Sequence, residues 1–294
     1  MIIFKYCKRC GFFSDFFFLM NFYIYCKKNN KNFVIDSNEW IYSSKLGWED
    51  YFSNINIIHE NSSSVDEIIK YPGSDFFEEY PIYEYKKYLW DIYKYNDNTK
   101  NIILEKSKEL NILNTKYGGI HIRRGDKLHS ESKLFDSTMY LKLLLSKYPE
   151  CQKIFLQTDD YTCYEELIDY IKNNELNIEI ITLCNENSRG VVVYDYDFEN
   201  PQIIENKEYI DKIIDILKNT KTVINMNSEE IYNHTIDLIV GLDIIFNSEI
   251  CVLDYQSNVS RFIKLAHKNY ENVFDITKVD VDLNYKICPT YGFF

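Results

Sequence analysis

One stretch decides how the rest of the chain is interpreted, and it reads Tyr117-Gly118-Gly119-Ile120-His121-Ile122-Arg123-Arg124-Gly125-Asp126-Lys127. Its first half alternates, with Ile120 and Ile122 on one face and His121 on the other, which predicts a β-strand. Its second half is a loop with arginines, an aspartate and a lysine. Ligands of α/β proteins bind at loops that leave the carboxyl ends of strands. The stretch favours an anion site, although alone it fits a surface loop with ordinary ion pairs equally well.

Length and charge limit the possible functions. The chain has 294 residues, a net charge of −12 and 46% hydrophobic residues, which is enough for one large domain or two ordinary ones. The acidic balance argues against nucleic acid as the main partner, because that requires a broad basic surface. A small phosphate-bearing molecule needs only a local basic cluster. The eight cysteines do not indicate a disulfide framework at this length, so we expect reduced thiols.

No segment is predicted to span a membrane. The apolar run from Phe12 to Tyr25 is interrupted by Ser14, Asp15 and Asn21, and it is shorter than the ~20 residues that a span needs. We interpret this run as a buried first helix. We therefore expect a soluble, cytoplasmic protein that lacks an export signal.

Strands and helices alternate after Tyr117. Strands are expected at 119–123, 153–158, 178–183, 221–225 and 250–253, with a short one at Val191-Val192-Val193. Helices are expected near 137–147, 162–173, 207–218, from Ser228 to 246 and from Ser257 onward. This alternation predicts a parallel sheet covered by helices on both faces.

The residues before Tyr117 give a weaker pattern. Strands are expected at 2–6 and 33–36, residues 53–75 are expected to form a surface excursion, and 82–113 are expected to be helical with a break at 96–101. The predicted inward positions of the helical region are Tyr85, Leu89, Ile92, Leu104 and Leu110. We place the domain boundary just before Tyr117, between an open-sheet α/β domain at 1–116 and a second α/β domain at 117–294.

Three further motifs lie at predicted strand ends or in loops. Ser257-Asn258-Val259-Ser260-Arg261 opens a helix, so its backbone N–H groups can bind an anion, although Ser257 can equally be a simple N-cap. Asp159-Asp160 ends another strand, where it can be catalytic, bind a metal or only start the next helix. Asp195-Tyr196-Asp197 is a D-x-D motif, a pattern that some enzymes use to bind a metal ion, but such short matches are common by chance in an Asp-rich chain.

Taken together, these residues resemble the fucosyltransferases that share an H-x-R-R-x-D loop, most closely the eukaryotic α1,6-fucosyltransferase that modifies the N-glycan core. The matching blocks are Cys10-Gly11-Phe12, Phe33 to Phe52, His121 to Glu131, Gln157 to Asp160, Leu242 to Ile244 and Ser257 to Arg261. The resemblance covers most of residues 7–265. It implies a GT-B-like fold, in which 1–116 is the open-sheet domain and 117–294 is a Rossmann-like domain that binds a GDP-sugar.

The resemblance also implies roles for the matching residues. The residues implied to hold the donor are His121 and Asp243 at the guanine or ribose, Tyr42 near the ribose, and Arg123, Ser257 and Asn258 at the diphosphate. The residues implied to serve the reaction are Glu131 as general base, Lys127 beside it in a proton relay, Arg123 on the β-phosphate, Arg124 in support, and Asp126, which can orient an arginine.

The implied activity is inverting transfer of fucose from GDP-fucose to a hydroxyl of a glycan acceptor, without a metal or other cofactor. The chain departs from the family pattern in several places. The spacing from Asp243 to Ser257 is shorter, so Asp237 is an alternative match, Gln256 replaces a serine, and residues 184–225 fit poorly, as an insertion would. The family's C-terminal SH3-like domain, stem and membrane anchor have no match in this sequence. Acceptor choice in the family depends partly on those parts, so the resemblance does not imply that the N-glycan core is the acceptor.

Two alternatives stay open at this point. The chain can be a catalytically inactive protein that binds GDP or a glycan on the same fold, or a transferase that uses another GDP-sugar. The sequence favours the fucosyltransferase, because the base, the relay lysine and the arginines are all present. The sequence gives no indication of the oligomeric state.

Overall fold

The computed structural model describes residues 2–6, 10–55, 67–70, 80–125, 134–193 and 219–277, with the backbone alone at 67–70. Two units share these residues. The described residues up to Leu104 and from Met226 to Ile236 form unit 1, and those from Glu105 to Asn225 and from Asp237 onward form unit 2. The division therefore falls within α3 (Asp97–Glu109) and within α8 (Ser228–Phe246). The sequence-based boundary before Tyr117 stays a prediction.

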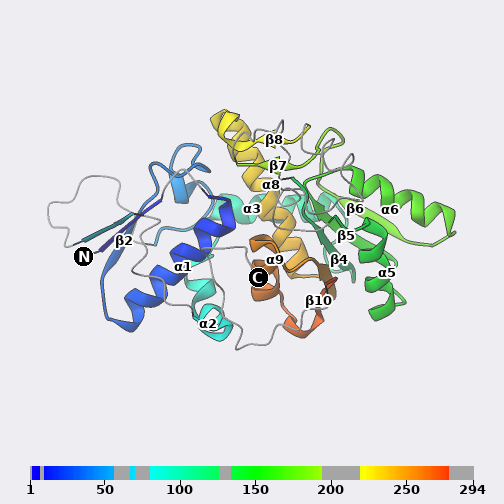
Figure 1. Cartoon of the computed structure of the whole chain (residues 1–294), viewed down its shortest axis with the longest axis horizontal. Helices are drawn as coiled ribbons and strands as arrows, with labels where there is room; N and C mark the ends of the chain where they lie inside the picture. Colours follow the sequence, from blue (N-terminus) through cyan, green and yellow to red (C-terminus); the bar gives the residue numbers. More distant parts are fainter. Residues whose placement is uncertain are drawn as a thin grey trace, which may run out of the picture. The chain divides into compact units, whose positions relative to one another are not determined.

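Unit 1 contains a parallel sheet in the order β2-β1-β3 (Figure 1). The strands are β1 (Ile2–Lys5), β2 (Phe33–Asp36) and β3 (Glu67–Lys70). The helix α1 (Phe12–Lys28) is buried along most of its length, as predicted from its phenylalanine-rich run. The prediction of a surface excursion at 53–75 is wrong at β3, because this short segment pairs with β1. Ile2 and its partner Glu67 are distant in sequence, so a local pattern does not reveal the pairing.

The helical region before Tyr117 divides into α2 (Ile82–Ile92) and α3. Tyr85, Leu89 and Ile92 are buried as predicted, but Leu104 is 46% exposed. The predicted break at 96–101 is also displaced, because Asn96 accepts a hydrogen bond from the backbone N–H of Thr99 at 2.8 Å and so begins α3 instead of interrupting it. Asparagine side chains favour such cap positions over helix interiors.

Unit 2 is built on a five-stranded parallel sheet in the order β10-β9-β4-β5-β6. Its strands are β4 (Gly118–Ile122), β5 (Lys153–Thr158), β6 (Glu179–Thr182), β9 (Ile250–Leu253) and β10 (Val273–Asp275). Parallel pairing aligns the carboxyl ends of all these strands along one edge, where α/β proteins bind ligands. The predicted parallel sheet is confirmed.

Helices cover both faces of this sheet (Figure 1). On one face, Ile120 and Ile122 pack into a buried cluster with residues of α5 (Ser137–Lys147) and α6 (Thr162–Asn173). On the other face, Gly119 lies against α8, and a Cβ added there would come within 2.9 Å of Ile245 Cδ1. The absence of a side chain at Gly119 therefore allows α8 to approach the sheet closely.

The connection from β6 to α8 contains a second, small sheet. In it β7 (Val191–Val192) pairs in parallel with β8 (Lys221–Thr222), and a 3-10 helix follows at Val223–Asn225. The predicted strand at 221–225 is therefore correct for its first two residues only. The predicted helix at 207–218 lies outside the described residues.

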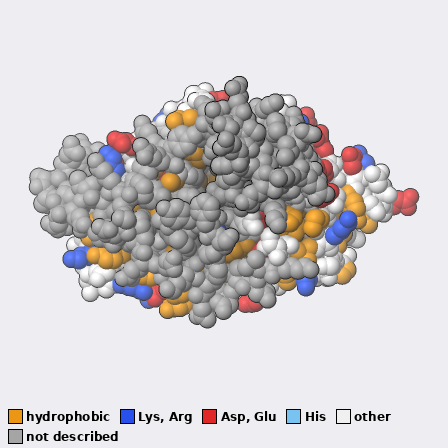
Figure 2. Space-filling view, viewed as in Figure 1, with side chains coloured by type: hydrophobic (Ala, Val, Ile, Leu, Met, Phe, Trp, Pro, Cys, Tyr) orange, Lys and Arg blue, Asp and Glu red, His pale blue; other side chains and the backbone are white. Residues whose placement is uncertain are grey.

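The surface agrees with the acidic composition. On the face in Figure 2, the basic side chains that the structure describes are interspersed with acidic and hydrophobic ones and do not gather into one broad patch. Within the described ranges, no helix combines the length and apolar composition needed to cross a bilayer.

Candidate functional site

The site begins with Arg123, the first residue after β4. Its guanidinium forms an ion pair with Asp159, the first residue after β5, and donates a hydrogen bond from Nη2 to the carbonyl oxygen of Val191 at 2.7 Å. The side chains of Arg123 and Asp159 are only 20% and 12% exposed. Because solvent screening is reduced there, this pair holds the guanidinium more firmly than an exposed salt bridge would.

Asp159 connects three segments at this edge of the sheet. Besides pairing with Arg123, its Oδ1 accepts from the backbone N–H of Arg124 at 2.8 Å and its Oδ2 accepts from that of Val191 at 3.1 Å. The sequence alone leaves the role of Asp159 open between catalysis, metal binding and helix initiation. The available signal was an acidic residue ending the strand that neighbours the arginine strand.

Arg124 has a different environment from Arg123. It is only 2% exposed, and its Nη2 donates to the carbonyl oxygen of Phe135 at 2.8 Å. Phe135 precedes Asp136, whose side chain caps α5 by accepting from the N–H of Thr138 at 2.8 Å. Arg124 therefore connects the end of β4 to the start of α5. This position fits the implied role of Arg124, which is to support the site around Arg123.

His121 links β4 to the first turn of α9 (Asn258–Ala266) through a buried chain of hydrogen bonds. Its Nδ1 lies 3.0 Å from Ser260 Oγ, and Ser260 Oγ accepts from Ser257 Oγ at 2.9 Å. Ser257 is the N-cap of α9, accepting from the Ser260 N–H at 3.1 Å. Burial, and to a lesser extent Arg123, lower the pKa of His121 to about 3, so the imidazole is neutral at pH 7.

Because of this contact, the start of α9 lies at the carboxyl end of β4. The predicted residue Asn258 opens the helix, and its Oδ1 accepts from Arg261 at 3.0 Å. The structure therefore brings Arg123, His121, Ser257 and Asn258 to the carboxyl ends of the neighbouring strands β4 and β9. An arginine and a helix N-terminus at one sheet edge form an environment suited to an anion.

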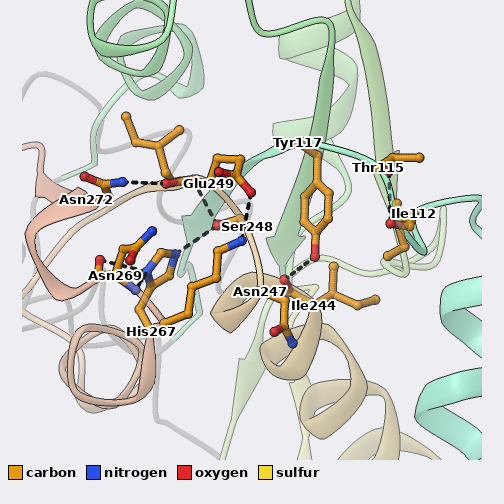
Figure 3. Close-up of polar contacts among 12 residues, drawn as sticks. Ile112, Thr115, Tyr117, Ile244, Asn247, Ser248, Glu249, His267, Asn269 and Asn272 are labelled. Atoms are coloured by element: carbon orange, nitrogen blue, oxygen red, sulfur yellow. Dashed lines mark hydrogen bonds and ion pairs between the residues drawn. The ribbon is translucent and has the colours of Figure 1, made fainter.

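Asp243 lies at the opposite edge. Tyr117, which precedes β4, donates to the carbonyl oxygen of Ile244 at 2.8 Å (Figure 3). Asp243 is the neighbour of Ile244 and accepts from Asn247 at 3.3 Å. Tyr117 and Arg123 flank β4, and a strand of this length separates them by roughly 20 Å. The structure therefore does not bring Asp243 together with Arg123, and its role at the guanine or ribose stays a prediction.

The alternative match, Asp237, lies almost two helical turns before Asp243 in α8. Burial raises the pKa of its carboxyl group, and Lys106 partly opposes this. In unit 1, the implied ribose neighbour Tyr42 is buried, its ring lies edge-on to Phe12, and its carbonyl oxygen accepts from the Tyr51 hydroxyl at 2.8 Å. Tyr42 is thus built into an aromatic core.

Several predicted residues lie outside the described part of the chain. These are Asp126, Lys127, Glu131 and the D-x-D residues Asp195 and Asp197. Among the residues that the structure does describe, no group of three or more His, Cys, Asp or Glu side chains could hold a metal ion. Metal independence stays a prediction.

No family profile matches the sequence, and no curated protein sequence matches it either. The fold, in contrast, is similar to solved fucosyltransferases. NodZ from Bradyrhizobium matches with a TM-score of 0.52 and 10% identity over 90% of this chain and 93% of that one. A NodZ α1,6-fucosyltransferase crystallised with GDP gives a TM-score of 0.55, with 10% identity over 90% and 92% of the two chains.

A plant enzyme has the same fold. The Arabidopsis thaliana FUT1 structure, a mutant in complex with GDP, matches with a TM-score of 0.52 and 6% identity over 90% of this chain and 68% of that one. At such low identities the similarity concerns the fold. The chain therefore has the GT-B-like fold of fucosyltransferases, which confirms the fold class predicted from the sequence.

Proposed function

We propose that the protein is a glycosyltransferase that moves fucose from GDP-fucose to a hydroxyl group of a glycan acceptor. The observation that carries the proposal is the position of Arg123 at the carboxyl end of β4, beside the start of α9. In this fold, that sheet edge is where an anionic ligand is expected, and structures of similar fold were solved with GDP. We assign the donor to the second domain, 117–294.

The proposed donor site uses two kinds of positive charge. Arg123 contacts the β-phosphate of GDP, because a guanidinium matches the geometry of phosphate oxygens and stays charged at all relevant pH values. Ser257 and Asn258 lie at the N-terminus of α9, whose backbone N–H groups and dipole favour a diphosphate. The neutral His121 supports this turn through its contact with Ser260.

The proposed reaction is a single displacement. An acceptor hydroxyl attacks the anomeric carbon of fucose from the face opposite to GDP, so the C–O bond to the acceptor forms while the bond to GDP breaks, and the configuration inverts. Glu131 takes the hydroxyl proton, and Lys127 beside it belongs to the proton relay. The departing GDP gains negative charge, which Arg123 stabilises. We propose that this charge stabilisation requires no metal.

The proposal is tested by incubating the protein with GDP-fucose and a panel of glycan acceptors and measuring released GDP and fucosylated product. We expect turnover by wild type, with and without EDTA, and a loss of about 100-fold or more in kcat for Glu131→Gln, as is typical for removal of a general base. Failure of wild type to bind GDP or turn over GDP-fucose would refute the proposal. Strong inhibition by EDTA would instead favour a metal site at the D-x-D motif.

The same experiment distinguishes two alternative functions. A protein that binds GDP but forms no product with any acceptor would be an inactive binding protein. A protein that turns over another GDP-sugar more efficiently than GDP-fucose would be a transferase with a different donor. In both cases the assignment of a GDP site would stand, and the assignment of fucose transfer would be replaced.

A further inference from the structure

The segment Ser188–Val192 is fixed by backbone hydrogen bonds on both of its sides. On one side, the Tyr161 N–H donates to the Ser188 carbonyl at 3.0 Å, and the Gly190 N–H donates to the Asp159 carbonyl at 2.8 Å. On the other side, the Lys221 N–H donates to the Gly190 carbonyl at 3.0 Å, and β7 pairs with β8. This segment, called the 188–192 strap below, belongs to the region that fits the family pattern poorly.

The strap touches the Arg123 loop at two glycines. Gly125 and Gly190 both adopt positive φ, at 65° and 96°. A Cβ added to Gly190 would lie 2.9 Å from the Gly125 nitrogen, and a Cβ on Gly125 would overlap the Val191 carbonyl. The two backbones therefore approach so closely that both positions exclude a side chain, and a substitution at either strains the backbone as well.

This close approach completes a ring of three polar contacts. The Arg123 guanidinium donates to the Val191 carbonyl at 2.7 Å, and the Val191 N–H donates to Asp159 Oδ2 at 3.1 Å. Asp159 in turn pairs with Arg123. Arg123, Asp159 and Val191 are each held by the other two. Asp159 and Val191 are also held by backbone hydrogen bonds of the strap, from Gly190 to the Asp159 carbonyl and between β7 and β8.

We propose that Asp159 and the 188–192 strap position the Arg123 guanidinium in advance for the terminal phosphate of a nucleoside diphosphate, and thereby select diphosphates over monophosphates. This inference rests on the proposed donor site at Arg123. An unrestrained arginine side chain has many rotamers and loses them on binding, whereas a held guanidinium does not. The backbone N–H groups of Arg124 and Val191 share the charge of Asp159, so the carboxylate can orient the guanidinium without fully neutralising it.

The test is a double-mutant cycle of Asp159→Asn and Arg123→Ala, with calorimetric titration of GDP and GMP. Asp159→Asn keeps the shape of the side chain but removes its charge. We expect it to weaken GDP binding about tenfold, equivalent to about 1.4 kcal/mol, and GMP binding less than about threefold. In the Arg123→Ala background, the same change should alter GDP affinity by less than about twofold. Equal losses for GDP and GMP, or equal losses in both backgrounds, would overturn the positioning role.

Gly190→Ala tests the strap itself. We expect weaker GDP binding with GMP binding retained, because the added methyl group on Gly190 pushes the strap away from Gly125 and the Arg123 loop. Asn114→Ala is the matched control, since Asn114 also has positive φ, at 59°, but lies before β4 at the other sheet edge. If both variants affect GDP binding alike, backbone strain and not the strap is responsible. If Gly190→Ala does not fold, the double-mutant cycle of Asp159→Asn and Arg123→Ala still tests the positioning of Arg123.

A second measurement separates this inference from the proposed function. If wild type binds neither GDP nor GMP, the proposed function fails, and the coupling between Arg123 and Asp159 is then measured in denaturant unfolding. Positioning predicts that the two substitutions change the unfolding equilibrium constant non-additively, by about fivefold or more. Additive effects would show that Asp159 does not hold Arg123.

Discussion

The Nδ1 atom of His121 lies 3.0 Å from Ser260 Oγ, in a buried contact that joins the central strand β4 to the first turn of α9. The contact places a neutral imidazole beneath the helix N-terminus that we assign to the diphosphate. It also connects the pH dependence of stability to the candidate site, because the ring must stay uncharged to remain buried.

His121→Asn should reduce the loss of stability in acid. Burial and Arg123 hold the pKa of His121 at about 3 in the folded protein, below the unfolded value of about 6.5. Between these values the unfolded chain binds more protons, so stability falls as pH decreases below 6.5, by up to about 1.4 kcal/mol per pH unit from this residue. Urea unfolding at pH 7.5, 6.0 and 5.0 measures the slope.

The matched control for this prediction is Ser260→Ala, which removes the hydrogen bond but leaves His121 buried. Because burial is the larger cause of the lowered pKa, this variant should keep most of the acid slope. His267 also has a lowered pKa, about 4, mainly through burial, so some slope should persist in His121→Asn. An unchanged slope in His121→Asn would contradict the assigned environment.

Asp15 should show the opposite dependence in unit 1. It lies within α1, is 1% exposed, and accepts from Trp40 Nε1 at 3.0 Å. Burial raises its pKa well above the usual value, and the Trp40 hydrogen bond opposes this only in part. The folded state therefore retains a proton that the unfolded state releases, and stability decreases as pH rises through the interval between the two pKa values.

The Asp15→Asn variant removes this titration while keeping an oxygen that can accept from Trp40. We expect it to be more stable than wild type at pH 8, with the difference shrinking as pH falls toward 4. Chemical denaturation over this pH range measures the difference. A difference that stays constant with pH would show that Asp15 is ionised in the folded protein.

The start of α8 depends on Asn227 and not on Ser228, although serine is also a favoured cap residue. Asn227 Oδ1 accepts from the N–H groups of Glu229 and Glu230 at 3.0 Å, and Glu230 accepts from the Asn227 N–H at 2.9 Å. Asn227→Ala should therefore destabilise the protein by about 1 kcal/mol. Ser228→Ala should change stability by less than about 0.5 kcal/mol. The reverse ranking in denaturant unfolding would restore Ser228 as the cap.

Periodicity was sufficient to predict several elements of unit 2. The predicted bounds of β5, α6 and β9 agree with the structure, because these elements are apolar segments bounded by polar turns and their pattern is local. The strand end at Arg123 and the cap at Ser257 were predictable for the same reason.

Long-range contacts explain what the sequence did not predict. Asp159 and Val191 are separated by 32 positions, and their hydrogen bond depends on how the strap crosses the sheet edge. Leu104 belongs to a helical pattern, yet it is exposed while its neighbour Ile103 is buried, since a small rotation of the helix changes which side chain faces inward. Asp243 matched a motif, but a motif does not specify at which sheet edge the residue lies.

The most direct test of the account is calorimetric titration of GDP into wild type, Arg123→Ala and Lys153→Ala. Lys153 is a matched control, because it is also 20% exposed and paired with a carboxylate, that of Glu179, but it begins β5 at the opposite edge of the sheet. We predict that Arg123→Ala weakens GDP binding at least about 30-fold, as expected when a charge-assisted contact worth about 2 kcal/mol is lost, while Lys153→Ala binds like wild type. Equal affinity of wild type and Arg123→Ala for GDP would contradict the account.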